Sequence, residues 1–379
     1  MRSTEWLVDP AVAYLNHGGF GALPRPVAEA ADRLRREVEA NPSDAFMRRW
    51  QGLVDDVRAR VALFLNADVT DLVFVANATA ATATVIDRLD LQPGDEIVTT
   101  DHRYPAVAEQ AAALGSRGVR VVEVTIPLDV ADPPAVVQRI TDAITDRTRL
   151  VVVDHIASPT GFVFPVAEII RAVHARDLPV LVDGAHAPGQ LDVDLRALDA
   201  DFWVGNLHKW VCSPRACAVL RVAPQWQERI RPLVASHGFR DGFHAAFDWT
   251  GTFDPIPLLA IPAALDFWDT LGWDDVRRHQ RGLVSAGARH AAAALGTAVP
   301  ISDRFTAAMR LVELPAPVDR EQGVALTERM TLDHKVTAYV THHQGRSFVR
   351  VCGQLYNQPE DYERLADALR AVLGEGTGG

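Results

Sequence analysis

The most constraining feature of the sequence is a series of seven short apolar segments between residues 70 and 222, separated by longer amphipathic ones. The short segments are rich in β-branched residues, whereas the longer ones repeat their apolar positions with the period of a helix. Continuous apolar strands connected by helices are typical of a mostly parallel sheet with both faces covered. The predicted strands are 72–76, 96–99, 119–124, 150–153, 180–182, 202–204 and 218–220, and the predicted helices are 80–89, 106–114, 134–145 and 166–175.

After about residue 225 the pattern changes to a smaller α+β arrangement. Helices are predicted at 258–271, 284–294 and 359–373, with strands at 307–312, 336–340 and 348–351. A chain of 379 residues is long enough for one large and one smaller domain. We therefore predict a large α/β ligand-binding domain at 21–250, a small C-terminal domain at 251–379, and an N-terminal segment at 1–20 that packs near the site.

Composition disfavours several classes of function. The net charge of −11 argues against nucleic acid as a partner. No apolar run approaches a membrane span or a signal peptide, so no membrane contact and a cytoplasmic location are expected. Three cysteines without a CxxC pair argue against a disulfide framework or a zinc site. The His342–His343 pair has no carboxylate at ligand spacing, so no metal is predicted.

Lysine is scarce, and its position is informative. The chain has 38 basic Lys and Arg residues, of which only Lys209 and Lys335 are lysines. Arginine stays protonated in proteins and cannot form an imine, whereas a lysine amine can. Lys209 follows the predicted strand 202–204, beside Trp210, where partial burial would lower its pKa and favour the neutral amine.

Asp183 follows the preceding strand, so Lys209 and Asp183 are expected at the same edge of the sheet, where ligands bind. A carboxylate beside a pyridine nitrogen keeps that nitrogen protonated, and the ring then acts as an electron sink. We therefore predict that the chain binds pyridoxal 5′-phosphate (PLP) through a Schiff base on Lys209, with Asp183 at the ring nitrogen.

Other strand ends supply further candidates. Ala78 and Thr79 begin a helix whose backbone N–H groups, with the Thr79 hydroxyl, could hold a phosphate, although ordinary helix capping is the alternative. His102 or Tyr104 could cover a flat ring, and His155 could reach the ring hydroxyl. The alternative for each histidine at a strand end is a structural, hydrogen-bonded role.

These motifs, in this order, resemble the class V aminotransferase family of fold-type I PLP enzymes, and within it the branch of isopenicillin N epimerase and its relatives. The resemblance runs from about residue 10 to 370 and rests on the segments Tyr14–Pro24, Asn77–Thr79, Asp101–Tyr104, Asp154–Gly161, Asp183–His186, Gly205–Trp210, Trp249–Asp254 and Val349–Asn357. The lysine motif within this ordered set is the specific element. Many members have Ser where Asn206 and Cys352 stand here.

The resemblance implies a role for each matching residue. Lys209 would carry the cofactor and move the Cα proton, Asp183 would pair with the pyridine nitrogen, and Arg350 would grip the substrate carboxylate beside Asn16 and His17. A homodimer with a shared site is implied as well. The residues expected to contact the cofactor are Ala78, Thr79, His102, Tyr104, His155, Asp183, His186, Asn206, His208, Lys209 and, from a partner subunit, Thr252.

Several reactions share a Cα carbanion, and the sequence leaves them open. We favour β-elimination, that is C–S cleavage of a cysteine-type conjugate, over epimerisation, which needs an acid on both faces of Cα. Tyr104 or His17 could supply that second acid. Transamination, decarboxylating deamination and a non-catalytic relative of the fold are further alternatives. Desulfuration is disfavoured because no cysteine lies in an evident mobile loop, and a nicotinamide enzyme is disfavoured because no GxGxxG follows the first strand.

Overall fold

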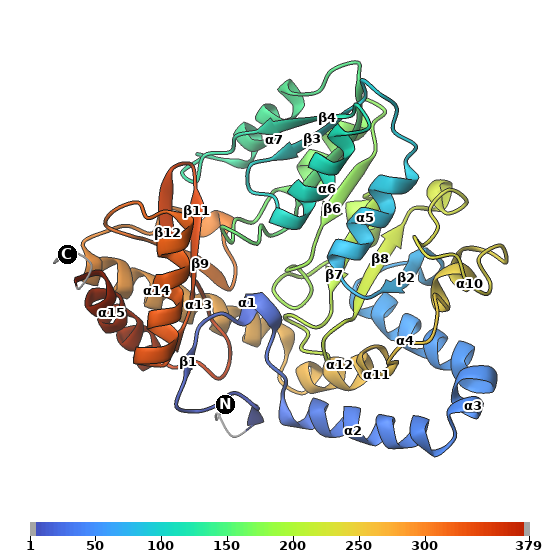
Figure 1. The fold of residues 1–379 in the computed structure, drawn as a ribbon, viewed down its shortest axis with the longest axis horizontal. Coiled ribbons are helices and arrows are strands. Elements are labelled where there is room, and N and C mark those ends of the chain that lie inside the picture. The colour runs from blue at the N-terminus through green and yellow to red at the C-terminus, as the bar shows by residue number, and fades with distance from the viewer. Residues whose placement is uncertain (1–4, 375–379) are drawn as a thin grey trace.

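The computed structural model describes residues 5–374 and confirms a large domain with a mostly parallel sheet (Figure 1). The seven strands lie in the order β2-β8-β7-β6-β5-β3-β4. Neighbouring strands from β4 to β7 pair in parallel, whereas β8 runs antiparallel to both β7 and β2. Their bounds are β2 Leu72–Val75, β3 Glu96–Thr100, β4 Arg120–Val124, β5 Thr148–Asp154, β6 Val180–Asp183, β7 Phe202–Asn206 and β8 Ala218–Val222.

Helices cover both faces of this sheet, as its continuous apolar strands require. Along β5, Val151 and Val153 belong to one hydrophobic core, whereas Leu150 and Val152 belong to another on the opposite face. Alternate residues of a strand point to opposite faces, so both faces of β5 are buried. The crossover helices are α5 Ala78–Arg88, α6 Pro105–Gly115, α7 Pro133–Asp142 and α8 Val166–His174.

The small domain contains a three-stranded antiparallel sheet in the order β11-β12-β9. These strands are β9 Met309–Glu313, β11 Tyr339–His343 and β12 Arg346–Cys352, and the helices beside them are α13 Trp273–Leu295, α14 Arg320–His334 and α15 Pro359–Gly374. The short strand β1 (Ala13–Tyr14) pairs in parallel with β10 (Val336–Thr337). The N-terminal segment is therefore attached to the small domain before the chain enters the large one.

Two long helices that the sequence analysis did not predict, α2 (Arg25–Ala40) and α4 (Trp50–Phe64), form a layer below the large domain (Figure 1). Helices α11 (Ile256–Leu259) and α12 (Ile261–Asp269) pack against both of them. Trp268 of α12 also donates a hydrogen bond to the Val211 carbonyl. By these contacts α11 and α12 pack on helices of the large domain, and the boundary at residue 250 stays a prediction.

The remaining elements are short. They are α1 His17–Phe20, α3 Pro42–Asp44, a π-helical turn at Ala45–Arg49, α9 Leu195–Leu198, α10 Phe243–Asp248, and 3₁₀ turns at Val69–Asp71, Pro224–Trp226 and Asp303–Phe305. Between residues 5 and 374, no helix combines the length and apolar character that crossing a bilayer requires.

Two glycines of α13 offer a matched test of the small-domain packing. A Cβ at Gly287 would overlap the ring of Tyr362 on α15, whereas a Cβ at Gly282 would meet no atom within 4 Å. We expect Gly287→Ala to lower the free energy of unfolding by about 1–3 kcal/mol because the helices cannot keep their spacing. Gly282→Ala should raise it by up to about 1 kcal/mol through helix propensity. Urea unfolding followed by circular dichroism measures both, and equal effects of the two substitutions would contradict this packing.

Candidate active site

Lys209 lies at the carboxyl end of the sheet, three residues after β7, and is 8% exposed. Its Nζ is 2.9 Å from Nε2 of His186, which follows β6. The indole N–H of Trp210 donates to Nδ1 of the same imidazole at 3.3 Å. Lys209, His186 and Trp210 therefore form a short hydrogen-bonded chain at the ends of two adjacent strands.

The direction of this chain follows from what each group can do. An indole N–H only donates, so Nδ1 of His186 accepts. Burial lowers the pKa of His186 well below its ordinary value, so the ring is neutral and its one proton lies on Nε2. That N–H can donate only to a lone pair, which a neutral amine has and an ammonium lacks. The environment thus selects the neutral amine of Lys209.

Burial acts on Lys209 in the same direction. The pKa of the amine falls from 10.5 to about 8 as the net result of burial, which lowers it most, of Asp183, which raises it, and of Arg350, which lowers it. A lysine with a pKa near neutrality is the form that attacks a carbonyl. The sequence-based expectation of a desolvated lysine at this position agrees with this environment.

Asp183, the last residue of β6, is 5% exposed and lies in register with Asp154 of β5. Its Oδ1 accepts the Ala185 N–H at 3.0 Å. Burial raises the pKa of Asp183, while the Ala185 N–H and the nearby Lys209 ammonium lower it. Burial and the Asp183 charge raise the pKa of Asp154 well above its ordinary value, so Asp154 is the member of the pair that takes up a proton first.

Arg350 of β12 brings the small domain to this edge. The guanidinium donates to the Ser158 carbonyl and hydroxyl and to Oδ1 of Asn16, the last at 2.8 Å. It also lies over the ring of Tyr339, 5.4 Å from its centroid. Among residues 5–374 its Nε has no hydrogen-bond partner, so the group retains a donor for a carboxylate. Ser158 was not among the predicted site residues, although it stands inside the segment Asp154–Gly161.

The N-terminus of helix α5 lies at the end of strand β7, with the first N–H groups of the helix directed toward it. Asn77 caps the helix by accepting the Ala80 N–H, and Asn206 accepts the Ala78 N–H at 2.9 Å. Ordinary helix capping, the alternative considered for this segment, is thus observed at Asn77. The N–H and hydroxyl of Thr79 and the NH2 group of Asn206 are left as donors for an anion at a helix N-terminus.

His208 can join this anion site only if it is protonated. Its Nδ1 donates to the Cys217 carbonyl at 2.9 Å, which leaves Nε2 without a proton in the neutral ring. Burial lowers the pKa of His208 to about 4 in the protein alone. A bound phosphate would raise that pKa, because a neighbouring anion favours the imidazolium.

Comparison with known proteins agrees with this arrangement. The family model "Aminotransferase class-V" matches residues 13–299. The chain belongs to the class-V aminotransferase family. It is 31% identical to isopenicillin N epimerase of Streptomyces clavuligerus, with 97% of each chain aligned, and 30% identical to putative L-cysteine desulfhydrase 1 of Oryza sativa subsp. japonica, with 97% and 84% aligned. The cystine C–S lyase C-DES bound to cysteine persulfide has the same fold, with a TM-score of 0.81 at 23% identity over 94% and 97% of the two chains.

The residues of this class-V protein fit PLP, the cofactor of the family. A lysine amine with a lowered pKa is present at Lys209, and a buried carboxylate lies on the adjacent strand at Asp183. Donors at the start of α5 suit a phosphate, and Arg350 suits a carboxylate. PLP would accordingly be held by Lys209, Asp183 and the N-terminus of α5, and it would supply an electron sink for chemistry at Cα.

The two residues considered for the ring face lie in different environments. His102 is fully buried, with Nδ1 at 2.8 Å from the Thr160 hydroxyl and Nε2 donating to the Ile126 carbonyl at 2.7 Å. Both ring nitrogens of His102 are thus engaged within the protein, and its ring packs against Phe162, Phe164 and His343, so a role at the ring face stays a prediction that these contacts disfavour. Tyr104 precedes α6 and is 40% exposed, which leaves it as the candidate for the ring face.

His17 also differs from its predicted role as an acid and substrate ligand. The imidazole is fully buried, with Nδ1 3.0 Å from the Tyr356 hydroxyl and Nε2 donating to the Lys209 carbonyl at 3.1 Å. Burial lowers its pKa to about 3. Because the Nε2 proton is hydrogen-bonded to the Lys209 carbonyl, we interpret His17 as a positioning residue and not as a second acid.

His155 and Thr252 complete the predicted set. The Nδ1 of His155 accepts the indole N–H of Trp203 at 3.3 Å, and burial lowers its pKa to about 4. Its backbone N–H donates to the Asp183 carbonyl, so it lies beside the carboxylate. Thr252 is exposed on the segment after α10, and its arrival from a partner subunit stays a prediction.

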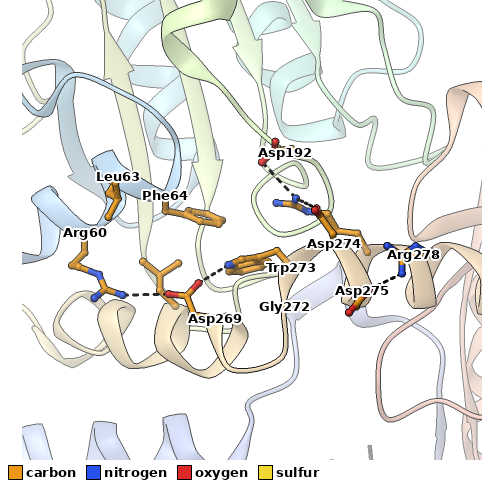
Figure 2. Close-up of a pocket in the computed structure, with 12 residues that line it drawn as sticks. Arg60, Leu63, Phe64, Asp192, Asp269, Gly272, Trp273, Asp274, Asp275 and Arg278 are labelled. Atoms are coloured by element: carbon orange, nitrogen blue, oxygen red, sulfur yellow. Dashed lines mark hydrogen bonds and ion pairs between the residues drawn. The ribbon is translucent and has the colours of Figure 1, made fainter.

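A separate surface cleft of about 690 Å³ lies between α4, α12 and the start of α13 (Figure 2). None of the predicted site residues lines it. Several of its charged side chains already form ion pairs, including Arg278 with Asp275 and Arg277 with Asp192 and Asp274. This cleft is therefore not the site of the chemistry carried by Lys209.

The hydrogen-bonded chain predicts a pH dependence for cofactor capture. The rate at which apoprotein binds PLP should rise with pH through about 8, because only the neutral Lys209 amine attacks the aldehyde. Trp210→Phe should move this midpoint upward, because Nδ1 of His186 loses its donor and the ring can turn its lone pair toward an ammonium. Stopped-flow absorbance from pH 6 to 10 measures both profiles. Trp268→Phe is the control, because it removes a buried indole whose N–H donates to the Val211 carbonyl and not to His186, and it should leave the midpoint unchanged. A wild-type midpoint near 10.5 would contradict a lowered pKa of Lys209.

Proposed function

We propose that this class-V protein cleaves the C–S bond of a cysteine-type conjugate by PLP-dependent β-elimination. Arg350 holds the substrate carboxylate, and Lys209 Nζ takes the Cα proton once the amine is free of the cofactor. Tyr104 would cover the ring face of bound PLP and could donate a proton to the leaving sulfur. The relatives named as cysteine desulfhydrases and the cystine C–S lyase of the same fold support this choice of reaction.

The observation that carries the proposal is the enclosure of His17. Epimerisation needs a second acid on the face of Cα opposite Lys209, whereas elimination does not. Of the two candidates for that acid, His17 is fully buried and uses both ring nitrogens in internal hydrogen bonds. Elimination is therefore favoured over epimerisation, because it does not need the second acid that His17 cannot supply.

The cysteines argue against sulfur transfer to the protein. Cys212, Cys217 and Cys352 are all buried, and burial raises the pKa of each thiol, that of Cys217 to about 12. A sulfur acceptor must be a reachable thiolate. Sulfur is accordingly expected to leave as a small thiol or persulfide.

Epimerisation is the second candidate, because the chain aligns over 97% of its length with isopenicillin N epimerase. Tyr104, which is 40% exposed, would then be the second acid.

We further propose a cytoplasmic homodimer in which Thr252 of one subunit completes the phosphate site of the other. Sedimentation of an active, cofactor-loaded monomer would contradict that arrangement.

The reaction can be decided by product analysis with the PLP-loaded enzyme. With L-cystine or an S-alkyl cysteine, we expect pyruvate, ammonium and the sulfur product in equal amounts. Lys209→Arg should lower this rate by roughly 10²–10⁴-fold, because the proton carrier is lost. Lys335→Arg, the matched change at the other lysine, should leave it unaltered.

The same samples in D₂O distinguish the alternative. Chiral chromatography and NMR detect deuterium at Cα and the D enantiomer of unconsumed substrate. A D enantiomer that accumulates without pyruvate would contradict elimination. In that case loss of the D product in Tyr104→Phe would assign the second acid.

A further inference from the structure

A cluster of three ligand-type side chains joins the two domains. Asp101 and His102 follow β3 of the large domain, and His343 ends β11 of the small domain. One ligand atom from each lies within 4.8 Å of those from the other two. The two imidazole rings are 4.2 Å apart between centroids, at an angle of 60°.

His343 has a buried nitrogen that nothing satisfies. Its side chain is 4% exposed, and its Nε2 has no hydrogen-bond partner among the described residues. That nitrogen lies 3.8 Å from Oδ2 of Asp101, so it faces the centre of the cluster. A buried polar atom without a partner is uncommon and indicates a missing ligand or ion.

The surroundings already orient the other two side chains. Asp101 accepts the Ile126 N–H on Oδ1 at 3.0 Å and the Gln344 amide on Oδ2 at 2.8 Å. Nε2 of His102 now donates to the Ile126 carbonyl, but Nδ1 lies 2.8 Å from the Thr160 hydroxyl, which can accept the ring proton when it moves to Nδ1 and frees the lone pair of Nε2. Outer hydrogen bonds of this kind orient metal-binding imidazoles and carboxylates.

We propose that Asp101, His102 and His343 bind one divalent transition-metal ion of the zinc type. Two neutral imidazoles and one carboxylate are a common ligand set for zinc, with water in the fourth position. In the sequence, His342–His343 lacks a carboxylate at ligand spacing, and for that reason no metal was expected. The fold supplies that carboxylate from a position more than 200 residues away.

The charge state of the cluster suits a cation. Asp101 supplies a carboxylate charge, and Nε2 of His343 faces it at 3.8 Å with no hydrogen-bond partner among the described residues. The nearest guanidinium groups are compensated, since Arg103 pairs with Glu123 and Arg346 with Glu313.

Binding would draw the domains together. Ligand atoms around zinc lie roughly 3.4 Å from one another at metal–ligand distances near 2.1 Å, so the cluster must contract. His102 Nε2 must give up its bond to the Ile126 carbonyl, which still accepts the Gln344 amide at 3.1 Å. The ion would therefore fasten the β11–β12 turn to the end of β3 and restrain the small domain, which carries Arg350.

Metal analysis of untagged, PLP-loaded protein tests the site. After chelator treatment, the protein is equilibrated with Zn²⁺, dialysed, and assayed by mass spectrometry of the metal. We expect one bound ion per chain, a higher unfolding temperature with Zn²⁺, and visible bands of four-coordinate cobalt when Co²⁺ replaces it. His343→Gln and Asp101→Asn should each weaken Zn²⁺ binding at least about tenfold.

His342→Gln is the matched control, because His342 is the exposed neighbour on the same strand and its Nδ1 contacts Ser347. It should retain wild-type Zn²⁺ binding and stability gain. Each variant is compared with wild type for its unfolding temperature without metal, so a folding defect is separated from ligand loss. Wild-type protein that retains less than one ion in five chains, or His343→Gln that binds as tightly as wild type, would overturn the proposal. Neither result bears on the reaction at Lys209.

Discussion

The site depends on keeping the Lys209 amine neutral in a place that also holds a carboxylate. The surroundings together, burial foremost, disfavour the ammonium by about 3 kcal/mol, the equivalent of lowering the pKa from 10.5 to about 8. Asp183 opposes this effect by attraction, and the hydrogen bond from His186 supports it by donating to the amine lone pair. The tautomer of His186 is set in turn by Trp210, the residue that follows the lysine. A local sequence, Lys209-Trp210, thus sets the protonation of its own amine through a histidine on the next strand.

The parallel sheet places these groups together because its strands end at one edge. β6 delivers Asp183 and His186, β7 delivers Lys209, and α5 brings its N-terminus to the same edge. The small domain contributes Arg350, and the N-terminal segment ties both parts together. Strand β1 pairs with the small domain, whereas His17 contacts the Lys209 carbonyl from behind. The N-terminal segment therefore connects the small domain to the backbone of Lys209 through the β1–β10 pairing and the His17 hydrogen bond.

The sequence allowed prediction of the elements that repeat an apolar period and of groups placed directly after a strand. The seven strands were predictable from their apolar pattern. Lys209 and Asp183 were predictable because each follows or ends a strand. Side-chain direction was not predictable: His102 follows β3 as His186 follows β6, yet His102 turns into a pocket formed by Phe162, Phe164 and His343. Contacts across the domains were also hidden, because Ser158 and Asn16 meet Arg350 only after the small domain has docked. For the same reason no local spacing brings Asp101 to His343.

The central claim is that Lys209 is the residue that holds the cofactor. The most direct measurement is mass spectrometry of peptides after the PLP-loaded protein is reduced with borohydride, for wild type, Lys209→Arg and Lys335→Arg. A yellow protein whose visible band disappears on reduction, with the pyridoxyl mass on Lys209 in wild type and Lys335→Arg and on no lysine in Lys209→Arg, is the predicted result. A pyridoxyl mass on Lys335, or a wild-type protein that takes up no PLP, would contradict the account.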